Sequence, residues 1–175
     1  MEANQKTTLP KVKWDQVEAN GKNLTIENQW FFMDVPIFCS RVFCFVGTRE
    51  KMKETAYAWI AGYGQEDAAD CAKCVEEYVD RNGPENCETG DAFGQNGTMY
   101  IRLNTMYLGA LQDVLVLNHE CLHAANAILC NIGLEDGPDI EGLCYTHQFI
   151  FGELMKEMMA FCGVQPVQNP HKKNP

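Results

Sequence analysis

The chain has 175 residues, of which 46% are hydrophobic, and its formal net charge is −10. This length and composition are typical of one globular domain and exclude a disordered chain. The negative charge argues against nucleic acid or an anionic membrane surface as a partner, because both attract basic proteins. No run approaches 18 apolar residues, so we expect no membrane-spanning segment.

The N-terminal part lacks the apolar segment of a secretory signal. Together with nine cysteines, an odd number, this predicts free thiols and a cytoplasmic location. Residues 1–28 are polar and poorly periodic, and we interpret them as an extended segment of a single domain that covers residues 1–162. One short strand is predicted near Leu24–Ile26.

Aromatic and β-branched residues dominate the stretch Trp30–Val46. This composition predicts one or two strands, with a break near Asp34–Pro36. Thr48 can then cap a helix. The apolar stripe of that helix would comprise Met52, Ala56, Trp59, Ile60 and Tyr63.

A second helix is predicted over residues 66–81, ended by Asn82-Gly83-Pro84. It contains a CxxC pair, Cys71 and Cys74. Both cysteines fit the apolar stripe of this helix, so core packing is favoured over a redox or metal-binding role.

Residues 83–97 are rich in Gly, Asn and Asp and predict a loop that could include a short strand at Ala92–Phe93. Asn96-Gly97 is a hairpin-type turn. The following stretch, residues 98–103, alternates in polarity, which predicts a half-buried strand. Its two faces would carry Met99, Ile101 and Leu103 on one side and Tyr100 and Arg102 on the other.

A long helix is predicted over residues 110–131, ended by Gly133. Another follows over residues 139–161, with Pro138 at its start and Gly163 past its end, and residues 163–175 are predicted to be a disordered tail. The order of elements predicts an α+β fold in which a small mixed sheet packs on segregated helices.

The first of these two helices contains the segment VLNHECLHAANAIL. His119 and His123 are four residues apart and therefore share one helix face, and Glu120 lies about 100° further round. This HExxH spacing is typical of two zinc ligands and a general base. The helix is apolar almost all the way round, which predicts that it is buried, and its polar residues follow one stripe. The alternative is that both histidines are ordinary core or boundary residues.

A catalytic zinc site has three protein ligands and one open position. Candidates for the third ligand follow the motif: Glu135, Asp136, Asp139, Glu141 and His147. We favour Glu141, because it would lie in the first turn of a helix that packs beside the motif. Tyr145, one turn further on, can share its face, whereas His147 lies about 240° away.

The motif HECLH with a glutamate on the next helix resembles the gluzincin branch of the HExxH metallopeptidases, the zincins. The stretch HECLHAANAILCNIGLEDGPDIEGLCYTHQF is also similar to short phage and prophage proteins, and the likeness covers about residues 97–155. The resemblance implies a minimal zincin-like fold with residues 98–103 as the edge strand of the cleft. It also implies that His119, His123 and Glu141 bind the metal, that Glu120 is the base, and that Tyr145 is the site tyrosine.

Our first hypothesis is therefore a Zn²⁺-dependent hydrolase, specifically a small metallopeptidase that acts on a peptide or protein. Tyr100 and Arg102 would contact the substrate, and Tyr145 or Arg102 would stabilise the oxyanion. The alternative is a catalytically inactive protein that binds zinc and uses the zincin fold to contact another protein. Such a protein could be phage-encoded and act on a host factor in the bacterial cytoplasm. The sequence leaves the oligomeric state open.

Overall fold

A mixed four-stranded sheet forms the centre of the computed structural model, which describes residues 23–62, 64–83, 89–95, 97–134 and 140–164. The β2–β3 and β4–β5 pairs are antiparallel, whereas the β3–β5 pair is parallel. The predicted α+β class with a small mixed sheet is confirmed. The strands lie in the order β2 (Gln29–Val35), β3 (Ser40–Val46), β5 (Thr98–Leu103) and β4 (Gly90–Gln95).

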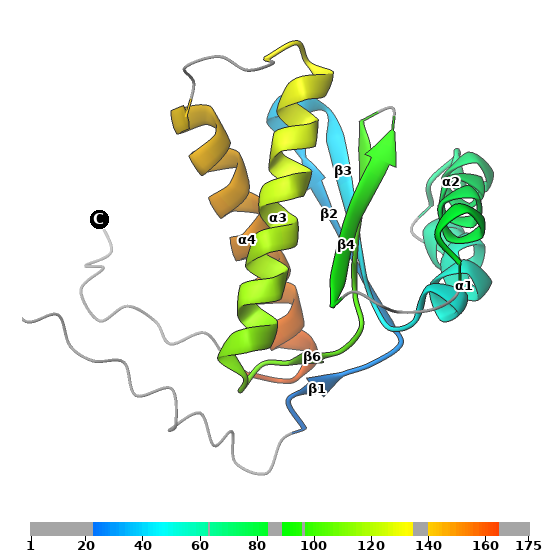
Figure 1. The fold of residues 1–175 in the computed structure, drawn as a ribbon, viewed down its shortest axis with the longest axis vertical. Coiled ribbons are helices and arrows are strands. Elements are labelled where there is room, and N and C mark those ends of the chain that lie inside the picture. The colour runs from blue at the N-terminus through cyan, green and yellow to red at the C-terminus, as the bar shows by residue number, and fades with distance from the viewer. Residues whose placement is uncertain (1–22, 63, 84–88, 96, 135–139, 165–175) are drawn as a thin grey trace, which may run out of the picture.

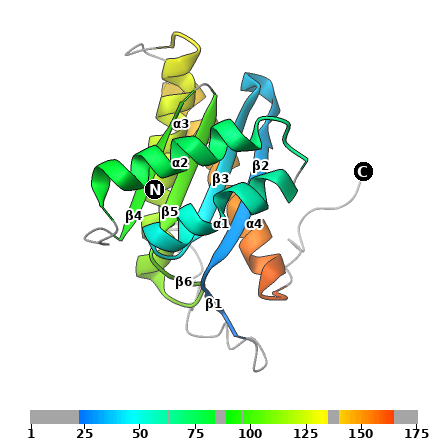
Figure 2. The same ribbon diagram turned by 90° about the vertical axis from the view of Figure 1, so that its right-hand side faces the viewer.

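Helices cover both faces of this sheet (Figure 1). One face carries α3 (Leu111–Asn131) and α4 (Ile140–Phe161). The other carries α1 (Arg49–Gly62) and α2 (Ala68–Asn82), which lie in front of the sheet in Figure 2. The expected segregation of the helices is therefore wrong, because the sheet buries apolar side chains on each face and each face needs a cover.

Two hydrophobic clusters fill the spaces on either side of the sheet. The cluster under α3 and α4 includes Met99, Ile101 and Leu103 of β5. The cluster under α1 and α2 includes Tyr100 of the same strand. All six residues of β5 are buried, so the prediction of a half-buried strand is wrong. The alternation was identified correctly, but both faces of this strand meet helices.

The predicted break in the first strand region separates β2 from β3. A short 3-10 helix, η2 (Pro36–Phe38), makes this turn. It ends at Cys39, whose φ of 48° lies in the left-handed region. The predicted strand near residue 25 is also present as β1 (Thr25–Ile26), and it pairs with β6 (Met106–Tyr107), which the sequence did not predict.

The predicted helices all occur, with bounds that differ by a few residues. Thr48 caps α1 as expected, accepting a hydrogen bond from the Lys51 backbone N–H at 3.2 Å. Tyr63, Pro138 and most of the predicted C-terminal tail lie outside the described residues. Within the described ranges, no helix combines the length and apolarity that a bilayer crossing needs.

A buried ion cluster connects α1 to the two strands β4 and β5. The Asp91 carboxylate accepts hydrogen bonds from Arg49 Nη2 at 2.8 Å and from Arg102 Nε at 2.5 Å. All three residues are buried, and Arg102 has no exposed surface. Charges removed from water in this way are tolerated only when they are paired. Asp91 is therefore a structural residue that two guanidinium groups share.

We predict that Asp91→Asn destabilises the fold by about 3–5 kcal/mol, because it removes the buried negative charge that both arginines contact. The measurement is the free energy of unfolding by urea. Asp80→Asn is the matched control, since Asp80 pairs with Lys53 on the exposed side of α2 and its loss should change stability very little. Equal effects of the two substitutions would contradict a structural role for the cluster.

Candidate functional site

Only one side of α3 is buried, which corrects the prediction of a helix surrounded by protein. The buried residues face the sheet and α4. The opposite side is exposed, and there His119 and His123 lie beside three leucines that face solvent. The motif therefore lies at the surface, where a metal and a substrate can reach it. The exposed leucines are Leu111 (58%), Leu115 (49%) and Leu122 (40%).

The two histidine side chains converge on one point. Their Nε2 atoms are 3.0 Å apart, and the imidazole rings meet edge to face at an interplanar angle of 87°. Two nitrogens that bind one tetrahedral zinc at the usual bond length are about 3.3 Å apart. The histidine pair therefore fits a shared zinc ion with little adjustment. The same distance also fits a hydrogen bond between two neutral imidazoles, with one ring donating N–H.

The Glu120 side chain lies against the start of β4. It is buried, with 7% of its surface exposed, and it packs against Gly90. Burial raises the pKa of the Glu120 carboxyl above its usual value, and the imidazoles of His119 and His123 oppose this shift. A carboxylate whose pKa is raised accepts a proton more readily near neutral pH, as a general base requires.

Gly90 makes this position of Glu120 possible. A Cβ atom added to Gly90 would lie 2.9 Å from Glu120 Cγ and 3.0 Å from Val116 Cγ1. Any larger residue would therefore displace the Glu120 side chain from the sheet edge. Gly90 could not be recognised from the sequence, because the strand signal was confined to Ala92–Phe93 and no pattern indicated that α3 would cross the beginning of this strand.

The strand that borders the motif is β4 and not β5. β4 is the last strand of the sheet, whereas β5 has β3 and β4 on its two sides. The prediction that residues 98–103 form the edge strand is therefore wrong. Tyr100 and Arg102, the predicted substrate contacts, are 1% and 0% exposed. Tyr100 donates a hydrogen bond to the Cys71 carbonyl at 3.1 Å, and Arg102 belongs to the ion cluster, so neither can contact a peptide at the motif.

The structure does not bring Glu141 and Tyr145 to the histidine pair. Both are exposed on α4. His147 of α4 instead contacts α3, with its Nε2 at 3.1 Å from the Asn118 carbonyl oxygen. Glu141 is six residues earlier and so about 240° away on the helix. Among the residues described, no group of three or more His, Cys, Asp or Glu side chains is arranged to hold a metal. Glu135, Asp136 and Asp139, the other acidic candidates, lie outside the described residues.

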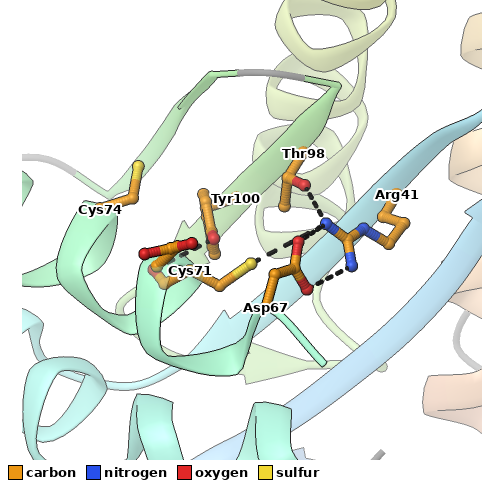
Figure 3. A pocket seen from close by; sticks show the side chains of 7 residues that line it. Arg41, Asp67, Cys71, Cys74, Thr98 and Tyr100 are labelled. Carbon is orange, nitrogen blue, oxygen red and sulfur yellow. Dashed lines mark hydrogen bonds and ion pairs between the residues drawn. The ribbon is translucent and has the colours of Figure 1, made fainter. Parts of the chain in front are cut away.

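The CxxC pair lines a small cavity of about 130 Å³ on the other side of the sheet (Figure 3). The Arg41 guanidinium contacts the Asp67 carboxylate through both terminal nitrogens, at 2.8 and 2.5 Å, and also reaches Thr98 Oγ1 at 2.9 Å. In Figure 3 the Cys71 sulfur points toward Arg41, whereas the Cys74 sulfur points elsewhere. These contacts connect the start of α2 to β3 and β5.

The two thiols of this cavity do not have the properties of a reactive dithiol. Burial raises the pKa of both Cys71 and Cys74 above the usual value for cysteine, and a reactive thiol requires a lowered pKa. Cys71 packs in the cluster under α2 and Cys74 packs against it. We therefore retain the packing role for this pair. The described cysteines are all free, and Cys87 lies outside the described residues.

Comparisons of the chain with models of protein families, with curated proteins and with solved structures found no match. The functional interpretation therefore depends on the residues of the site and on their geometry.

We predict that Gly90→Ala lowers the free energy of unfolding by about 1–3 kcal/mol, because the added methyl group overpacks the contact between β4 and α3. Chemical denaturation measures this change. Gly152→Ala is the matched control, since a Cβ atom at Gly152 meets nothing within 4 Å. That substitution in the middle of α4 should stabilise the fold by about 0.5–1 kcal/mol. If both alanines stabilise, Glu120 does not occupy the position described above.

The Arg41–Asp67 pair predicts a specific dependence of stability on pH. Its hydrogen bonds lower the pKa of Asp67 below the usual value of 3.8. A group with a lowered folded-state pKa stabilises the fold above its unfolded pKa, and this contribution is lost as the pH falls through the folded pKa. The stability difference between the wild type and Asp67→Asn should therefore shrink below about pH 4.

The control for this prediction is the same substitution in an Arg41→Met background. There the effect of Asp67→Asn should differ much less between pH 6 and pH 3, because the side chain that contributes most to the lowered pKa of Asp67 is gone. The Asp67 side chain is 44% exposed, so added salt should also weaken the effect in the wild type. A pH dependence that survives Arg41→Met would show that another group causes it.

Proposed function

We propose that this chain is a zinc-dependent hydrolase, specifically a small metallopeptidase of the zincin type. The observation that carries this proposal is the convergence of His119 and His123 at 3.0 Å on an exposed helix face, with Glu120 held beside them. Two exposed imidazoles that share one point, next to a largely buried carboxylate, have the arrangement expected of two zinc ligands and a general base. A zinc ion explains all three residues together.

Each protein group has a distinct role in this proposal. His119 and His123 would hold zinc through Nε2. When bound, zinc would lower the pKa of a water molecule and polarise a substrate carbonyl. Glu120 would be the general base that accepts a proton from the attacking water and the acid that returns it to the leaving amine. Its contact with Gly90 restricts the carboxylate to the edge of the site, which favours a base over a third metal ligand.

The third ligand would come from the acidic residues after α3. Glu141 remains a candidate if the first turn of α4 rearranges when zinc binds. Glu135, Asp136 and Asp139 are the alternatives, and all three precede α4 in the chain. Zinc affinity of the four single alanine variants would identify the ligand, since loss of one ligand among three should weaken binding far more than loss of an unrelated carboxylate.

The free edge of β4 is the proposed binding position for an extended substrate. β4 pairs only with β5 among the described strands, and its first residue contacts Glu120. A peptide that added to this edge through backbone hydrogen bonds would pass the base and the histidines. This proposal replaces the position along residues 98–103, which lies inside the sheet.

The second candidate function is a protein that binds zinc, or no metal, and acts through contacts with another protein, for instance a host factor of a phage. Two observations favour it. The described residues include no group of three or more His, Cys, Asp or Glu arranged to hold a metal, and Leu115 and Leu122 of the same helix are exposed, as apolar residues are at interaction surfaces. The two candidate functions differ in the role of the Glu120 carboxylate, which is a general base in the hydrolase and has no catalytic role in the interaction protein.

Protein purified without added metal should contain one zinc per chain, measured by elemental analysis. Glu120→Gln should retain that zinc and melt normally, because glutamine keeps the size of the side chain and removes only the base. Cleavage of a peptide library should fall about 10²- to 10⁴-fold. His123→Ala should instead lose zinc and thermal stability together, because metal binding stabilises the folded state.

Three outcomes would decide against parts of this proposal. Full zinc content in the double variant His119→Ala, His123→Ala would end the metal assignment. Loss of zinc in Glu120→Gln to the same extent as in His123→Ala would make Glu120 a ligand. A wild type that holds zinc but cleaves nothing, with Glu120→Gln keeping full biological effect, would establish the interaction protein.

A further inference from the structure

An apolar groove lies between η2 and the first half of α4, away from the histidine pair. Its volume is about 710 Å³. Its lining has no charged side chain, and the only side-chain polar groups in it belong to a tyrosine, a threonine and a glutamine. The groove is lined by Val35, Pro36, Ile37, Phe38, Gly142, Tyr145, Thr146, Gln148 and Phe149.

Several apolar and aromatic side chains of this groove are unusually exposed to solvent. Ile37 is 86% exposed, Tyr145 is 68% exposed and Phe149 is 43% exposed. Single exposed apolar residues are common in proteins, but a continuous apolar groove marks a surface that another segment covers. The absence of charge in the lining means that the covering segment must insert uncharged apolar side chains.

The N-terminal segment of this chain has the composition that the groove requires. Residues 1–22 include the stretch TLPKVKW, in which Leu9, Val12 and Trp14 are apolar. The other terminal segment, residues 165–175, has one aliphatic residue, Val167, among prolines and polar residues. Residues 8–14 are therefore the better match for an uncharged apolar lining.

The charges beside the groove and in the segment are complementary. Glu141 of α4 is exposed and directly precedes Gly142 of the lining. In the segment, Lys11 and Lys13 flank Val12 on both sides. With Val12 directed into the groove, one of the two lysines would lie toward this acidic border.

The segment is long enough to reach the groove. The described chain begins at Asn23, close to β1 at the lower end of the sheet in Figure 1. The groove is at the opposite end of β2, a strand of seven residues and thus about 23 Å in length. Residues 9–14 precede Asn23 by 9 to 14 positions, and an extended chain of that length spans about 30–50 Å.

We infer that residues 8–14 of this chain occupy the groove between η2 and α4, with Leu9, Val12 and Trp14 as the inserted side chains. This inference is independent of the proposed hydrolase function, because the groove contains neither histidine of the motif.

Photo-crosslinking tests the inference on the full chain. Benzoylphenylalanine is placed at Tyr145, in the groove, and in a second protein at Tyr57, a control that is 60% exposed on α1. Equal amounts of ¹⁴N- and ¹⁵N-labelled chains are mixed before irradiation, so that mass spectrometry distinguishes crosslinks within one chain from those between chains. We expect crosslinks within one chain from position 145 to residues 8–14 and none from position 57.

Two further variants make the result decisive. Leu9→Asp and Val12→Asp together should reduce the crosslink from position 145 at least tenfold without lowering the melting temperature of the described fold. Lys6→Asp and Lys22→Asp, changes outside residues 8–14, should preserve it. Crosslinks between chains would show that a second copy of the chain occupies the groove. Crosslinks to other segments, or no crosslinks at all, would show that residues 8–14 do not occupy it. Each of these results would overturn the inference.

Discussion

The packing of α3 against β4 and β5 fixes the positions of His119, Glu120 and His123, on which the rest of the site depends. Small and medium side chains, Cys121, Ala124 and Ala125 among them, lie on the buried side of α3 and allow the helix to approach the sheet closely. Gly90 allows the same close approach at the beginning of β4. Once the helix is seated in this way, its rotation is fixed, and the 3.6-residue period places every other side chain. The histidines then face solvent, and Glu120 faces the sheet edge.

This arrangement separates two tasks within five consecutive residues. His119 and His123 are exposed, so the metal and substrate of the proposed hydrolase would have access to their Nε2 atoms. Glu120 is mostly removed from water, which raises the pKa of its carboxyl. A carboxylate on the exposed face would titrate normally and would be a weaker proton acceptor near neutral pH. The difference in environment comes entirely from the angle of about 100° between adjacent residues of a helix.

Charge is distributed unequally across the two layers of helices. The layer of α1 and α2 contains the Arg49–Asp91–Arg102 cluster and the Arg41–Asp67 pair, and both connect a helix or its start to the sheet. The layer of α3 and α4 is joined to the sheet by apolar contacts. Exposed apolar surface is found on this second layer as well, in the leucines beside the motif and in the groove beside η2. Contacts with other polypeptide segments are therefore expected on this side.

Sequence alone determined the four helices, the strands other than β6 and the full length of β4, the α+β class and the spacing of His119, Glu120 and His123, because these depend on local propensity and helical period. It could not determine which strand lies at the sheet edge, since β5 pairs with β3 across more than fifty residues and no local signal records that pairing. The sequence also could not determine which face of α4 would be buried. Thr146, Ile150, Leu154 and Met158 are its buried residues, and their packing turns Glu141 and Tyr145 outward. Tertiary contacts alone decided which candidate ligands meet, because burial of one helix face fixes the direction of all the others.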